Sequence, residues 1–175
     1  DELDKSSVTA SFNRIVKNDF GLASSAPVVK AENNWWGCNE GPAGDDCDPL
    51  EEKEDADADP WLVMAISELP SPLIPGTNFT FTADLTKNSN GADTSTLGYL
   101  PDGTTVAFTP IERVNPDEAG LASGTASTTA SLPVTQVSFN LCARLDAEQL
   151  CRSVVITQPV ITWADDAWVG MPVGT

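Results

Sequence analysis

The chain has 175 residues, of which 26 are acidic, nine are basic and none is histidine, so that its net charge is −17. This charge disfavours nucleic acid as a partner, because Lys and Arg must neutralise phosphates. The absence of histidine excludes serine triads, cysteine–histidine pairs and His-based zinc sites. No apolar run approaches the length of a transmembrane helix, so we expect no membrane span.

The first expected unit, residues 1–66, consists of short β-runs that end at asparagine or glycine. Two such runs cover residues 8–18 and 28–37, and Asn13 and Asn33 recur 20 positions apart. That spacing is close to one rung of a parallel β-helix, in which each turn of the chain lays short strands on the previous turn. An ordinary hairpin or meander with asparagine turns fits the same spacing.

A charged segment at residues 48–59 is expected to be a solvated loop, because it cannot bury its side chains. Within it Asp55, Asp57 and Asp59 alternate along the chain. Calcium prefers several oxygen ligands, so these three residues are candidate calcium ligands, although the glycine and glutamate of a full EF-hand loop are missing. No other cofactor is expected.

A stretch with three prolines in residues 68–76 is too stiff for a central strand and marks a domain boundary. Beyond it, residues 67–157 form the second expected unit, a β-sandwich of several short strands separated by Asn-Gly, Asp-Gly and proline turns. The remaining residues, 158–175, form an extended C-terminal tail. Together these units predict an all-β chain.

The four cysteines fall into two local pairs, Cys38 with Cys47 and Cys142 with Cys151, without a C-x-x-C pattern. Locality favours these two disulfides among three connectivities, and they indicate an oxidising, extracellular or cell-surface setting. If Cys142 faces Cys151, the tip of that hairpin lies at residues 146–147.

Carboxylates are the only candidates for catalysis, and the best cluster is Glu40, Asp45, Asp46 and Asp48 around the first disulfide loop. Hydrolysis or elimination would need two of them in a cleft, with the pKa of one raised by burial. A charge run is usually a solvated face, so we predict that the chain is not an enzyme.

Three tryptophans, Trp35, Trp36 and Trp61, have two alternative roles. They are large enough to cap the open apolar edge of a coil. Exposed indoles would instead stack on sugar rings, which requires at least one of the three to be accessible. A glycan therefore remains an alternative partner.

Two segments resemble known families. Residues 33–42, followed by Asp-Pro-Trp-Leu at 59–62, resemble the closing rung of secreted right-handed parallel β-helix repeat proteins. Residues 74–89 and 100–108, with a Pro-Asp-Gly-Thr turn before a strand, resemble bacterial Ig-like domains of the invasin and intimin type. The resemblance implies a short parallel β-helix end-piece followed by an Ig-like β-sandwich and an extended C-terminal tail.

The tail resembles the entry segment with which such multidomain proteins open a following β-helix. We expect Val160, Ile161, Trp163 and Trp168 to anchor it in a neighbouring subunit. If the tail of one copy completes the exposed coil of the next by strand addition, the contact is heterologous and produces an open filament.

The sequence therefore predicts a secreted, non-enzymatic structural module that is a subunit of a filament, stalk or surface layer and binds other copies of itself. One alternative is a glycan-binding or adhesive module. Another is the non-catalytic C-terminal part of a β-helix enzyme that degrades polysaccharides.

Overall fold

The computed structural model describes residues 7–22, 28–50 and 56–157. These residues form strands, turns and two short 3-10 helices, η1 (Gly41–Ala43) and η2 (Ile111–Arg113), with no α-helix among them. The prediction of an all-β chain is confirmed at this level. Within the same residues, no helix has the length and apolar character needed to cross a membrane.

A small parallel sheet occupies the N-terminal part of the chain. It has the strand order β1 (Ser7–Thr9), β2 (Val28–Lys30) and β3 (Ala56–Asp57). Each strand belongs to one successive turn of the chain, and an isolated parallel bridge joins Arg14 to Trp35 beyond the strands. We refer to these turns as rung 1 (residues 7–16), rung 2 (28–37) and rung 3 (56–62).

The register between rungs differs from the predicted spacing of 20. Ser7 pairs with Val28 and Arg14 with Trp35, so Asn13 lies level with Asn34, 21 positions later. Asn33 instead lies level with Phe12, and the Phe12 N–H donates to the Asn33 carbonyl at 3.0 Å. Both corner residues adopt left-handed backbone, with φ of 61° at Phe12 and 57° at Asn33. The corner therefore has the same geometry in both rungs, although phenylalanine gave no sign of it.

The expected loop at residues 48–59 is partly ordered structure rather than solvated chain throughout. Ala56 and Asp57 pair with rung 2, and the Ala31 N–H donates to the Asp57 carbonyl at 2.6 Å. Ala58 is buried, and so is Asp48 at the start of the segment. A small alanine can enter the coil interior between charged neighbours, which a count of charges along the chain does not reveal.

Two four-stranded antiparallel sheets make up the rest of the structure. One has the order β11-β10-β6-β8 and the other β4-β5-β9-β7. The strands are β4 (Leu62–Ile66), β5 (Asn78–Asn88), β6 (Thr105–Thr109), β7 (Val114–Asn115), β8 (Glu118–Gly120), β9 (Thr125–Ser131), β10 (Val137–Leu145) and β11 (Glu148–Ile156).

The strand β4 joins the N-terminal rungs to these sheets. It follows rung 3 directly and pairs with β5, although the sequence analysis assigns it to the first unit. The run of small and β-branched residues at 121–130 is not one continuous strand. A turn with positive φ at Ser123 and Gly124 interrupts it, and β9 begins only at Thr125.

The two four-stranded sheets share one hydrophobic core. Phe81 of β5 and Phe108 of β6 are fully buried and meet edge to face, with ring centroids 6.1 Å apart. Trp35 of rung 2 belongs to the same buried cluster, so the core continues from the sheets into the rungs. A smaller apolar cluster, with Ala31, Trp36 and Ala58, lies among the N-terminal rungs.

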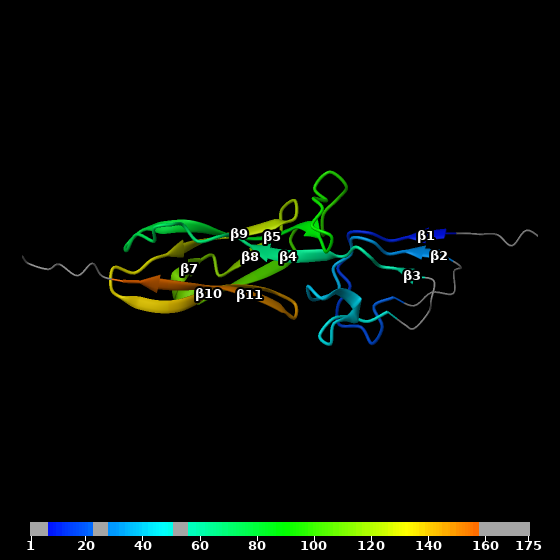
Figure 1. The fold of residues 1–175 in the computed structure, drawn as a ribbon, viewed down its shortest axis with the longest axis horizontal. Coiled ribbons are helices and arrows are strands. Elements are labelled where there is room, and N and C mark those ends of the chain that lie inside the picture. Colours follow the sequence, from blue (N-terminus) through cyan, green and yellow to red (C-terminus); the bar gives the residue numbers. More distant parts are fainter. Residues whose placement is uncertain (1–6, 23–27, 51–55, 158–175) are drawn as a thin grey trace, which may run out of the picture.

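Figure 1 shows that the molecule is elongated. The rungs lie at one end of its long axis, where β1, β2 and β3 run side by side, and β11 ends near the opposite end. The chain therefore leaves the described structure, after Thr157, at the end that is remote from β1.

Candidate functional site

The hairpin of β10 and β11 reaches from the sheets to the rungs. Its register pairs Cys142 with Cys151 and Leu145 with Glu148, so residues 146 and 147 form the tip. This confirms the register and tip predicted from the cysteine spacing. Asp146 adopts left-handed backbone there, with φ of 56°, a conformation that aspartate tolerates better than most residues.

The Asp146 carboxylate is the central acceptor of this contact. It accepts a hydrogen bond from Trp35 Nε1 at 2.9 Å and from Arg14 Nε at 2.9 Å, and Arg14 Nη2 completes a bidentate ion pair. The side chain of Asp146 is only 7% exposed. The hydrogen bond with Asp146 raises the pKa of Arg14, which keeps the guanidinium charged. One carboxylate therefore links rung 1, rung 2 and the hairpin.

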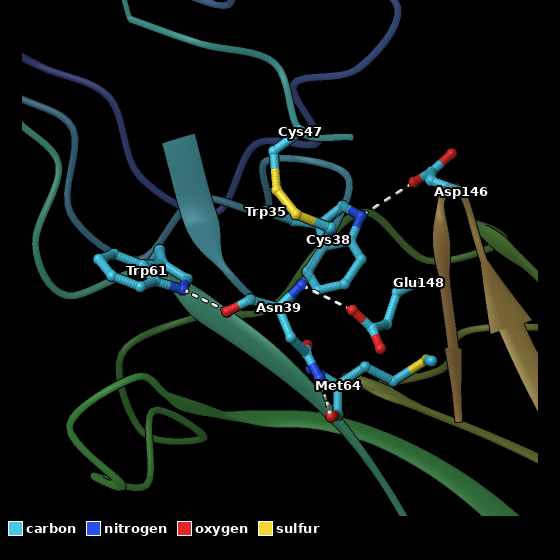
Figure 2. Close-up of a disulfide and its surroundings, with 8 residues drawn as sticks. All are labelled: Trp35, Cys38, Asn39, Cys47, Trp61, Met64, Asp146 and Glu148. Atoms are coloured by element: carbon cyan, nitrogen blue, oxygen red, sulfur yellow. Dashed lines mark hydrogen bonds between the residues drawn. A yellow bond between two sulfur atoms is a disulfide. The ribbon is translucent and has the colours of Figure 1, made fainter. Parts of the chain in front are cut away.

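Asn39 makes the second set of contacts, just beyond rung 2. Its backbone N–H donates to Glu148 Oε2 at 2.8 Å, while its side-chain amide donates to the Met64 carbonyl and accepts from the Met64 N–H. Trp61 Nε1 donates to the Asn39 carbonyl at 2.8 Å. Figure 2 shows these bonds converging beside the disulfide. We call the whole arrangement, with Asp146, the hairpin-tip joint.

Both predicted cysteine pairs lie at disulfide distance. The Cα atoms are 5.3 Å apart in Cys38–Cys47 and 4.1 Å apart in Cys142–Cys151. The first disulfide closes the loop that presents Asn39 to the hairpin. Cys38 and Cys47 also lie near the Glu40 carboxylate, but their sulfurs are bonded to each other and supply no thiolate for a metal.

Rung 1 lies at the edge of the small parallel sheet. Val8 is 49% exposed, whereas Val29, its partner in rung 2, is 2% exposed. Among the described residues, β1 pairs only with β2, so no strand in this part of the chain covers its other edge. An edge with exposed apolar side chains is a surface on which a further strand can add.

An asparagine ladder runs through the rungs. Asn34 is fully buried, and its Oδ1 accepts from the backbone N–H and the side-chain amide of Asn13, at 2.9 and 3.1 Å. Its own amide donates to the carbonyls of Ala10 and Ala31, at 2.7 and 2.6 Å. One level up, Asn13 is exposed, and its Oδ1 accepts no hydrogen bond from the described protein groups.

The candidate catalytic carboxylates do not form a free acid–base pair. Asp48 is buried, and its oxygens accept from the backbone N–H groups of Lys17 and Asn18. Glu40, Asp45 and Asp46 are exposed. A cleft of about 540 Å³ between the rungs and the β10 sheet contains Asp46, Asp48 and Asp146, of which the last two are occupied as structural acceptors. The absence of enzymatic activity stays a prediction.

Two of the three proposed calcium ligands lie within the described residues. Asp57 and Asp59 are exposed, and the Asp59 N–H donates to Asp57 Oδ1 at 3.3 Å. Asp55 lies outside the described residues. Calcium binding therefore stays a prediction.

The three N-terminal tryptophans differ in accessibility. Trp35 and Trp36 are completely buried, so neither can stack on a sugar ring. Trp61 is half-buried, and its ring packs over Gly41, where an added Cβ would collide with it. Within the glycan alternative, Trp61 is therefore the one member of this group with an accessible face.

The residues of the hairpin-tip joint carry no recognisable pattern in the sequence. Arg14 and Asp146 are 132 positions apart, and no local pattern connects them. The disulfide register did place Asp146 at a hairpin tip, which was the only signal. The predicted tail anchors, Val160, Ile161, Trp163 and Trp168, lie outside the described residues.

No family model and no curated protein matches the chain. Among solved structures, a crystal structure of the S-layer protein rSbsC(31-844) is similar, with 17% sequence identity and a TM-score of 0.38. The similarity covers 59% of this chain and 14% of that one, so the chain spans about one seventh of the length of the protein that it matches. At this identity and score, the likeness supports no functional argument.

Proposed function

We propose that the chain is a secreted, non-enzymatic structural module, a short parallel β-helix end-piece carried by an Ig-like β-sandwich. In this proposal it is a subunit of an extracellular filament, stalk or surface layer. Copies join head to tail when the C-terminal tail of one adds as a strand to rung 1 of the next.

The exposure of rung 1 carries the proposal. A valine that is 2% exposed in rung 2 has a counterpart that is 49% exposed in rung 1, although the two occupy equivalent, inward-facing positions. Covering an apolar side chain of this size stabilises a contact by about 1 kcal/mol or more. Rung 1 therefore has the surface of a coil that lacks one neighbour.

The positions of rung 1 and of the last described residue, at opposite ends of the molecule, support head-to-tail joining. The described chain ends near one end of the long axis and rung 1 lies at the other (Figure 1). A tail that starts there and binds rung 1 of a second copy uses two different surfaces, and such a heterologous contact produces an open chain when successive copies do not close into a ring. The two disulfides agree with an oxidising, extracellular setting.

The hairpin-tip joint supplies the stiffness that a filament subunit or stalk needs. Its bonds connect rung 1 and rung 2 to a hairpin of the other unit through a nearly buried carboxylate. Hydrogen bonds to charged groups contribute about 1.5–3 kcal/mol each when buried, so a hinge at this position would have to break several of them.

Electron microscopy of the full chain beside a version that ends at Thr157 tests the proposal. Every contact described above lies within residues 7–157, so the shorter chain should keep its thermal unfolding midpoint. We expect fibres from the full chain and monodisperse particles from the shorter one. Monodisperse particles from both at high concentration would contradict self-assembly, and would favour a part of a longer chain whose preceding residues supply the missing rung.

A further inference from the structure

We infer that residues 162–170 of the tail form a further rung, which stacks in parallel on rung 1 of a second copy in one fixed register. This inference rests on the proposed function and specifies its contact. The tail sequence matches rung 2 at the positions where the structure constrains the residue type.

Rung 2 and the tail share one pattern. Ala31-Glu32-Asn33-Asn34-Trp35-Trp36-Gly37 corresponds to Ala164-Asp165-Asp166-Ala167-Trp168-Val169-Gly170. Alanine, an acidic residue, a short polar residue, tryptophan, an apolar residue and glycine occur in the same order. In this alignment Ala164 lies level with Ala10 of rung 1 and Trp168 lies level with Arg14.

Two of the shared positions have unusual backbone geometry. Asn33 and its rung 1 partner Phe12 both have φ near 60°, and the tail has Asp166 there, a residue that tolerates this conformation. Gly37 has φ of 97°, and the tail again has glycine, Gly170. A register chosen for alanine and tryptophan alone therefore also places Asp166 and Gly170 at the two positions where rung 2 has positive φ, the first of which rung 1 shares at Phe12.

The alanine position excludes the neighbouring registers. Ala31 is 1% exposed, so this site in the coil admits only a small side chain. A shift of one residue in one direction would place Trp163 at that site, and a shift in the other direction would place Asp165 there. The first overfills the interior and the second buries a carboxylate without a partner.

The ladder also has an acceptor at the correct level, Asn13 Oδ1, to which no group of the described residues donates. In the structure, the Asn13 N–H donates to Asn34 Oδ1, one rung below. In the assembled state the Ala167 N–H would donate to Asn13 Oδ1 in the same way. Trp168 would cover the Arg14 guanidinium, which belongs to a side chain that is 36% exposed, and a cation over an indole face is favourable.

Cysteine cross-linking of the full chain tests the register. All four native cysteines are in disulfides, so introduced thiols are the only free ones. Thr9 pairs with the exposed Lys30, so position 9 faces outward, and neighbouring strands lie about 4.8 Å apart, within disulfide reach. We expect a mixture of Thr9→Cys and Trp163→Cys chains to cross-link. The control mixture, Thr9→Cys with Ile161→Cys, keeps the side-chain face but shifts the register by two residues, and should not.

A pair of tail variants provides a second test that does not depend on cross-linking. Ala167→Asn restores the ladder residue and adds an amide donor to Asn13 Oδ1, which should lower the critical concentration for assembly about threefold to tenfold. Ala164→Asn places the same amide at the small alanine site and should raise that concentration. Both substitutions lie in the tail, outside the contacts that hold residues 7–157 together.

The outcomes separate the two proposals. The register is supported if the 9/163 pair cross-links, the 9/161 pair does not, and the two asparagine variants change the critical concentration in opposite directions. If the wild-type chain assembles through its tail, but the 9/161 pair cross-links or Ala167→Asn gains nothing, the register is wrong while strand addition survives. If the wild-type chain does not assemble at all, the proposed function is wrong, and this inference with it.

Discussion

Replacing Asp146 should separate two contributions of the hairpin-tip joint to the free energy of unfolding: the hydrogen bond from Trp35 and the ion pair with Arg14. Asp146→Gly removes the acceptor of Trp35 Nε1 and the partner of Arg14, without requiring a side chain in left-handed backbone. A buried donor left unsatisfied costs about 1–3 kcal/mol. The ion pair adds only about 0.2–1 kcal/mol, because the Arg14 side chain is 36% exposed and solvent screens it. We therefore expect a loss of about 2–3 kcal/mol in the free energy of unfolding.

Asp146→Asn is the matched variant. It keeps an oxygen for Trp35 Nε1 and tolerates φ of 56°, but it removes the charge, so it should cost less than about 1 kcal/mol. For a chain of this size, each 1 kcal/mol lowers the thermal midpoint by about 2–4 °C. Asp117→Asn, at an exposed position outside the joint, is the control.

Thermal and urea unfolding, followed by circular dichroism, measure these differences. We expect Asp146→Gly to be the least stable, Asp146→Asn to be more stable, and the Asp117→Asn control to be the most stable. Equal losses for the two Asp146 variants would show that the bond to Trp35 contributes nothing measurable. A glycine variant as stable as the control would refute the joint as a source of rigidity.

Three further changes test other parts of the structure. Asn34→Ala removes four hydrogen bonds of a fully buried side chain, so amide exchange at residues 10–16 should accelerate while the β5–β9 amides stay protected; unchanged exchange in rung 1 would contradict the ladder. Replacing both Cys38 and Cys47 by serine opens a short loop and should cost about 2–3 kcal/mol in urea unfolding, whereas a loss below about 0.5 kcal/mol would mean that the loop holds its shape without the bond. Because every copy carries a charge of −17, light scattering should show faster assembly at 0.3 M than at 0.03 M salt; a slower rate would indicate that attractive charges, rather than apolar and backbone contacts, join the copies.

The features that follow from local chemistry could be predicted from the sequence. Alternation and turn residues predicted an all-β chain, and equal spacing of Cys142 and Cys151 about residues 146 and 147 gave the register of the last hairpin. Some residue types, such as paired cysteines, have one dominant structural role. At such positions the neighbouring residues alone are enough to predict the local structure.

The rest depends on which distant segments meet. Phe12 gave no sign that it occupies the same left-handed corner as Asn33, so the asparagines were aligned one residue away from the observed register. Asp146 and Arg14 looked like ordinary surface charges, because only the fold brings the hairpin tip to the rungs. Long-range polar contacts of this kind leave no periodic signal, and they require the structure.

Hydrogen exchange of the full chain, at concentrations below and above the onset of assembly, tests the central claim most directly. Strand addition at rung 1 predicts that assembly protects amides in two segments, residues 7–16 and residues 162–170, and leaves the two four-stranded sheets unchanged. An exchange pattern that does not depend on concentration, or protection gained along the free edge of β11 instead, would contradict the claim.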